Sequence, residues 1–89
     1  MISQKDYIKI YDELADDIFS YCYLRLPERE KAKELLQKVF MKVWEGVKAK
    51  KIINVKMHLY KTANHLIQET RSKNIHRLTI YSYNGFIRL

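Results

Sequence analysis

Polar and ionisable side chains recur at helical spacing between residues 58 and 72. They are His58, Lys61, His65, Gln68 and Ser72, with Asn64 and Arg71 beside them. Residues three or four apart share one face of a helix, so this spacing gathers hydrogen-bond donors on one surface. Such a surface can contact the phosphates and base edges of a nucleic acid. The simpler alternative is a helix face that only meets water.

The net charge of +7 is concentrated in the same part of the chain. Residues 48–77 hold eight Lys and Arg against one Glu, whereas residues 1–47 hold eight against nine Asp and Glu. A basic segment on a near-neutral body suits contact with a phosphate backbone, because each neutralised phosphate releases counterions. The charge therefore favours a nucleic-acid partner, with a solvated basic face as the alternative.

Other chemistries find little support in the residue pattern. The two glycines are isolated and cannot form a phosphate-binding loop. His58 and His65 are about 10 Å apart along a helix, which is too far for both to bind one metal ion. No Ser or Cys has the sharp-turn context of a catalytic nucleophile, and every carboxylate except Glu69 lies in the first half of the chain. We expect a protein that is not an enzyme and that needs no cofactor or metal.

Two helices are expected to form the first half of the chain. Apolar residues recur every three or four positions over residues 4–25, which predicts the first helix. Pro27 ends it and suits the first turn of a second helix over residues 27–45, which should pack antiparallel to the first. Gly46 follows in a position typical of a helix carboxyl end. The second helix has a clear apolar face, formed by Ala32, Leu35, Leu36, Val39, Phe40, Val43 and Trp44.

A basic loop and a third helix follow. Residues 47–53 lack a helical stripe and contain Lys48, Lys50 and Lys51, so we expect a loop there. Asn54 can cap a third helix that continues to about residue 73. Its inward face is Val55, Leu59, Thr62, Ala63, Leu66, Ile67 and Thr70.

The last segment is less regular. Residues 78–83 have a β-like composition, and Asn84-Gly85 is a turn signal. A fourth short helix, an ordered tail and a linker all fit this pattern. The predicted fold is an all-α bundle of three to four helices in residues 1–74, with residues 75–89 as a tail, short extra helix or linker.

The expected location is cytoplasmic. The amino terminus lacks the features of a signal peptide, and no run approaches the roughly 20 apolar residues of a membrane span. The single Cys22 cannot form an internal disulfide and falls in an apolar stripe, where we expect a small buried hydrophobe.

Two blocks of the sequence carry a family resemblance. Residues 32–44 read AKELLQKVFMKVW and residues 54–66 read NVKMHLYKTANHL. In order and spacing they resemble region 2 of sigma-70-type transcription initiation factors, particularly the extracytoplasmic-function (ECF) subfamily. With the first helix, the resemblance covers roughly residues 5–73. Full factors of this type carry a further helix-turn-helix region 4, and we expect these 89 residues to lack it.

The resemblance implies two binding surfaces. In the family, the second helix docks on the clamp helices of RNA polymerase, which gives the docking residues Glu34, Gln37, Lys38, Met41 and Lys42. The basic loop and third helix read and open the promoter minus-ten element, and the loop also receives an extruded base. The implied DNA contacts are Lys48, Lys50, Lys51, Lys56, His58, Tyr60, Lys61, Asn64, His65, Gln68 and Arg71, with Tyr60 placed to stack on an unpaired base.

Departures from the family pattern leave a second function open. His58 stands where the family has Trp, and His65 stands where it has Asn. Lys33 and Lys38 replace family acids, and Glu69 replaces Asp. The main expectation is a transcription initiation module that binds core RNA polymerase and single-stranded promoter DNA. The alternative is a sigma-like regulator, a co-sigma or competitor, that no longer reads DNA. Further partners would be an anti-sigma factor or a chain that supplies region 4.

Overall fold

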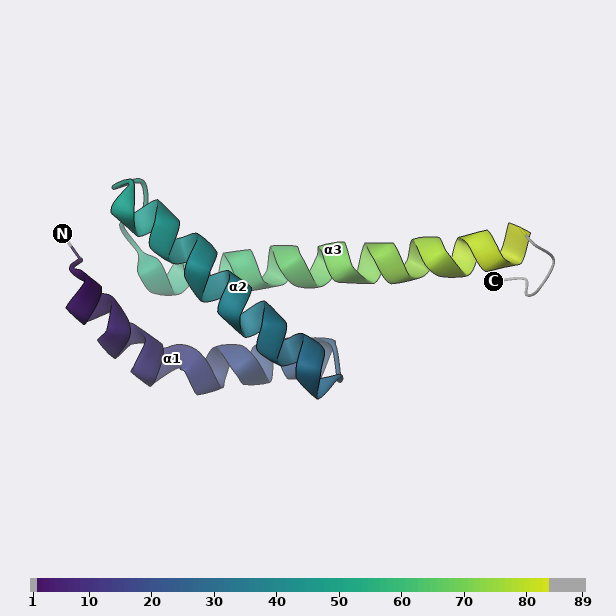
Figure 1. The fold of residues 1–89 in the computed structure, drawn as a ribbon, viewed down its shortest axis with the longest axis horizontal. Coiled ribbons are helices and arrows are strands. Elements are labelled where there is room, and N and C mark those ends of the chain that lie inside the picture. Colours follow the sequence, from purple (N-terminus) through teal and green to yellow (C-terminus); the bar gives the residue numbers. More distant parts are fainter. Residues whose placement is uncertain (1, 84–89) are drawn as a thin grey trace.

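Three packed helices make up the computed structural model, which describes the backbone of residues 2–83 and the side chains of residues 2–72 (Figure 1). They are α1 (Gln4–Arg25), α2 (Arg29–Lys48) and α3 (Val55–Tyr83). The chain turns back from α1 into α2, and α2 lies across α3. Each helix contacts the other two. The predicted all-α class is confirmed.

The bounds of α1 agree with the prediction from the sequence. Ser3 and Asp6 form a capping box: the Asp6 N–H donates to Ser3 Oγ at 3.1 Å, and the Ser3 N–H donates to Asp6 Oδ2 at 3.3 Å. This reciprocal pair satisfies amides that the helix leaves unbonded and fixes its start. The Ser3 backbone N–H, followed by the Ser3 side chain, lowers the pKa of the Asp6 carboxyl. At the other end, the Leu26 N–H donates to the Cys22 carbonyl at 2.8 Å and closes the last turn.

The predicted place of Pro27 in the second helix is wrong. α2 begins at Arg29 with Glu28 as its N-cap, and Pro27 lies in the link between the helices. The side chain of Leu26 is buried, so the chain must leave α1 toward the core before it turns. Residues 26–28 form this non-helical link, and α2 begins only at Arg29.

The carboxyl end of α2 also differs from the prediction. Gly46 lies inside the helix, and α2 continues to Lys48 because the side chain of Val47 is buried and needs the helical backbone to reach the core. The left-handed residue after the helix is Lys50, with φ 60°. Its N–H donates to the Val47 carbonyl and that of Lys51 donates to the Gly46 carbonyl, both at 3.0 Å. These two bonds form a Schellman motif, and the basic loop is correspondingly short.

α3 is capped as predicted but is longer than predicted. Asn54 Oδ1 accepts from the Met57 N–H at 3.0 Å. The helix runs to Tyr83, so the end near residue 73 and the β-like interpretation of residues 78–83 are both wrong. Extending an existing helix costs far less than starting a new element, and residues 55–83 contain neither glycine nor proline. The expected turn at Asn84-Gly85 lies outside the described residues, and the division of the chain at residue 74 stays a prediction.

The core draws on all three helices. Its largest fully buried side chains are Ile18, Cys22, Val39, Val43, Leu59 and Ile67. The buried Tyr7 hydroxyl donates to the Phe40 carbonyl at 2.6 Å and so ties α1 to α2. Cys22 is buried, as predicted, and burial raises the pKa of its thiol. The shared core thus packs the three helices in one arrangement, which sets the direction of their exposed faces.

Candidate nucleic-acid interface

The outward face of α3 presents most of the predicted polar stripe. Lys61, Asn64, His65, Gln68 and Ser72 are exposed, whereas His58 is half-buried. Lys56 and Arg71 are exposed as well. The structure therefore gathers most of these cations and amides on the solvent side of one helix.

Met57 also belongs to this outward face. Its side chain is 53% exposed, and its position is four residues before Lys61. The sequence-based prediction missed it. The sequence does contain a sign of it, since Met57 is an apolar residue outside the inward stripe of the third helix. An exposed apolar side chain of this kind can pack against an unpaired base.

Three predicted DNA contacts on α3 already have partners within the chain. The rings of Tyr60 and of Tyr21 on α1 form a T-shaped pair with a centroid distance of 5.2 Å. The Arg71 guanidinium donates to the Arg25 carbonyl at the end of α1, at 2.9 Å. His65 Nε2 lies 2.8 Å from Glu69 Oε2 on the same helix. α1 thus positions part of this surface, a contribution that the sequence-based prediction did not include.

Tyr21 is itself held in place. The Arg25 guanidinium carbon lies 3.6 Å from the centroid of the Tyr21 ring, and Arg25 Nη1 donates to the Tyr21 carbonyl at 3.1 Å. A cation over an aromatic face is an attractive contact. Tyr60 therefore rests against a fixed aromatic neighbour, which limits the orientations its own ring can take.

The basic loop projects its cations into solvent. Lys48, Lys50 and Lys51 are all exposed, and Lys48 still belongs to α2. The ammonium of Lys48 lies 6.0 Å from the Trp44 ring centroid. The three lysines cluster at the turn between α2 and α3, next to the start of the α3 stripe.

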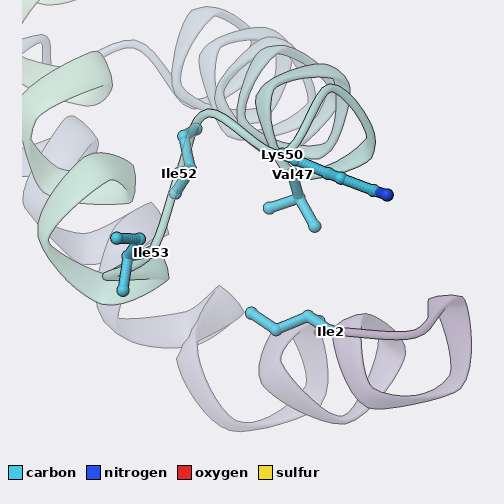
Figure 2. Close-up of a pocket in the computed structure, with 5 residues that line it drawn as sticks. All are labelled: Ile2, Val47, Lys50, Ile52 and Ile53. Carbon is cyan, nitrogen blue, oxygen red and sulfur yellow. The ribbon is translucent and has the colours of Figure 1, made fainter.

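An apolar hollow lies beside the basic loop (Figure 2). It has a volume of about 310 Å³ and is lined by Ile2, Val47, Lys50, Ile52 and Ile53. Figure 2 shows Val47 and Ile2 facing each other across it, while the Lys50 ammonium extends away. Ile53 is 95% exposed. The sequence-based prediction missed these isoleucines, although two adjacent isoleucines in a basic loop are a visible signal.

The outer face of α2 carries the predicted docking residues. Glu34, Gln37, Lys38, Met41 and Lys42 are all exposed, and Met41 is 63% exposed. Two shallow hollows border this face. One, of about 230 Å³, lies against α1 and is lined in part by Ile8 and Trp44; the other, of about 400 Å³, lies against α3. Met41 contributes to both and forms a ridge between them.

The described part of the chain contains no group of three or more His, Cys, Asp or Glu side chains placed to hold a metal ion. Among the described residues, no helix is both long enough and apolar enough to cross a membrane.

The fold defines a small all-helical module with polar residues exposed on the outer faces of α2 and α3. A profile of the Sigma-70 region 2 family matches residues 10–75, which is most of the chain and covers all of α2 and the greater part of α1 and α3. The chain belongs to this family. The family is not enzymatic. Its members bind RNA polymerase and recognise the promoter minus-ten element, as sigma factors do. Neither a search of curated proteins nor a search of solved structures gives a match.

Proposed function

We propose that this chain is a transcription initiation module of the extracytoplasmic-function type. In this proposal it docks on the clamp helices of core RNA polymerase through the outer face of α2. It also holds the single-stranded minus-ten region of a promoter against the basic loop and α3. The observation that carries the proposal is the family match over residues 10–75, combined with exposure of every expected docking residue on α2.

The two surfaces are compatible with one ternary complex. The docking residues lie on α2, and the polar stripe lies on α3. The basic loop joins the two helices. A DNA strand bound to the loop and α3 therefore lies beside the polymerase-facing side of α2 without covering it. Because the core fixes the helices, docking on polymerase also fixes the direction in which the loop lysines point.

Electrostatics support the promoter-facing side. The exposed cations of the loop and of α3 reach the phosphate backbone, which positions the strand without specifying sequence. Base contacts would come from Asn64, Gln68 and the ring of Tyr60. On the outward face of α3, the Glu69 carboxylate is paired with His65, so its repulsion of a phosphate is reduced when the imidazole is protonated.

A second candidate is a sigma-like regulator that occupies a partner without reading DNA. The intramolecular contacts of Tyr60, His65 and Arg71 favour it, because each side chain must give up or share a partner to reach a nucleic acid. The two candidates differ in one measurable property. A DNA-reading module binds single-stranded DNA with a salt-dependent affinity and a base preference, whereas an interaction-only module binds it weakly and without base preference.

The first test is retention of the chain by purified core RNA polymerase. The wild type is compared with a Gln37→Ala/Met41→Ala double variant, which truncates the centre of the docking face. A Ser20→Ala/Leu24→Ala double variant is the matched control, since it removes one exposed polar and one exposed apolar side chain from α1. We expect retention of wild type and control and loss of the docking variant. Equal retention of all three would refute docking through α2, and retention of none would refute polymerase binding.

A further inference from the structure

Gly46 lies within α2, and the loop residue Ile52 packs directly against it. A Cβ placed on Gly46 would be 2.9 Å from Cγ1 of Ile52 and closer still to its Cδ1. Real side chains do not approach that closely, so any larger residue at position 46 must displace Ile52. Ile52 is half-buried against the core, and its β-branched side chain has few alternative rotamers.

The loop backbone is tied to the same turn of α2. The Gly46 carbonyl accepts from the Lys51 N–H at 3.0 Å, and the Val47 carbonyl accepts from the Lys50 N–H at the same distance. The side chain of Ile52 and the backbone of the two lysines therefore converge on one turn. Where the backbone of Ile52 shifts to relieve the contact, Lys50 and Lys51 move with it, because the three residues are consecutive.

Glycine within a helix weakens that helix relative to alanine, because it loses more conformational freedom on folding. A left-handed backbone does not explain the glycine at position 46, because the residue with that conformation is Lys50. The close approach of Ile52 is the remaining local reason for a glycine at this position.

We propose that Gly46 is the positioning residue of the basic loop. Its missing side chain seats Ile52 on α2, and this seat holds Lys50 and Lys51 in the arrangement that meets the DNA backbone. It also places Ile52 and Ile53 in the wall of the apolar hollow (Figure 2). The inference rests on the DNA-binding part of the proposed function and adds to it a residue that touches no DNA.

The test combines two measurements on four proteins: the wild type, Gly46→Ala, Ile52→Ala and the Gly46→Ala/Ile52→Ala double variant. Loop position is measured by the rate of trypsin cleavage after Lys50 and Lys51. DNA binding is measured by fluorescence anisotropy of a labelled single-stranded oligonucleotide over a range of salt concentrations. Ser20→Ala, on the exposed side of α1, is the control for adding alanine to a helix.

We expect Gly46→Ala to accelerate cleavage and to lower the steepness of the salt dependence by about 1.4, which is the loss of two lysine contacts to a single strand. At 0.15 M salt this corresponds to an affinity loss of about 15-fold. Ile52→Ala frees the loop in a different way and should have a similar effect. In the Ile52→Ala background, Gly46→Ala should then change either readout by less than about twofold, because the two residues act through one contact.

Each outcome distinguishes the inference from the proposed function. Unchanged cleavage in Gly46→Ala overturns the inference, whatever the DNA result. Faster cleavage with unchanged DNA affinity reduces Gly46 to a structural residue and also overturns it. Additive effects in the double variant show that Gly46 and Ile52 act independently, which is a third refutation. A wild type without affinity for single-stranded DNA refutes the DNA-binding part of the proposed function instead, while the cleavage rates still test the seat of Ile52.

Discussion

Lys50 occupies a position where stability and DNA binding should oppose each other. Its left-handed backbone, with φ 60°, is one that a side chain disfavours by about 1 kcal/mol, and glycine adopts it without this cost. Its ammonium group is exposed and belongs to the basic loop. Replacing Lys50 with glycine should therefore stabilise the fold and weaken DNA binding, while Lys50→Ala removes the charge and keeps the strain.

The expected magnitudes follow from these two terms. Lys50→Gly should be more stable than Lys50→Ala by about 1 kcal/mol, which raises the melting temperature by roughly 4–8 °C in a domain of this size. Both variants should lose one phosphate contact. That lowers affinity for single-stranded DNA about fourfold at 0.15 M salt and reduces the steepness of the salt dependence by about 0.7.

Thermal melting by circular dichroism and fluorescence anisotropy with a labelled oligonucleotide provide the two measurements. The pair of variants separates the causes, because only the backbone term differs between Gly and Ala and only the charge term differs between Ala and Lys. A Lys50→Gly variant no more stable than Lys50→Ala would contradict the left-handed backbone. An unchanged salt dependence in both would remove Lys50 from the DNA-binding surface.

Three further predictions test other contacts. Tyr7→Phe should cost about 1 kcal/mol at pH 7, the usual net value of one hydrogen bond, here to the Phe40 carbonyl. Burial raises the pKa of Tyr7 to about 12, so the wild type loses stability as pH rises from 10 to 12, by about 1.4 kcal/mol per pH unit. Tyr7→Phe should lack this contribution, and parallel curves in urea melts across this range would disprove it. The lowered pKa of Asp6 stabilises the fold above pH 3.8, so the advantage of wild type over Asp6→Asn should disappear as pH falls below that value; an advantage that persists at pH 2 contradicts this. Tyr60→Phe should keep affinity for single-stranded DNA and Tyr60→Leu should lose it roughly tenfold, since only an aromatic ring can stack on a base; equal affinities would show that Tyr60 only packs against Tyr21.

Local patterns in the sequence were sufficient for much of the fold. The apolar repeat over residues 4–25 and the capping residue Asn54 act over three or four positions, and the structure agrees with both. Gly46 could not be interpreted in the same way. Its reason is a contact with Ile52 six residues later, across a turn whose geometry no local pattern contains.

The candidate surfaces likewise combine features that follow from local sequence patterns with contacts that depend on helix packing. Exposure of Gln37, Met41 and Lys61 follows from helical periodicity, because these positions lie opposite the apolar stripe. The partners of Tyr60 and Arg71 do not follow from it, since both are supplied by α1, some 40 residues earlier in the chain. Such contacts depend on how helices pack, and the sequence alone leaves that packing open.

The length of α3 has a mechanical consequence. Its 29 residues form one hydrogen-bonded rod of about 43 Å, and Figure 1 shows its carboxyl-terminal part extending beyond α1 and α2. The same rod carries the stripe of Lys61, Asn64 and Gln68. A helix without an internal break transmits a push or a twist along its axis rather than absorbing it at a hinge. A partner that binds the distal end of α3 would therefore change the orientation of the Lys61, Asn64 and Gln68 stripe on the same helix.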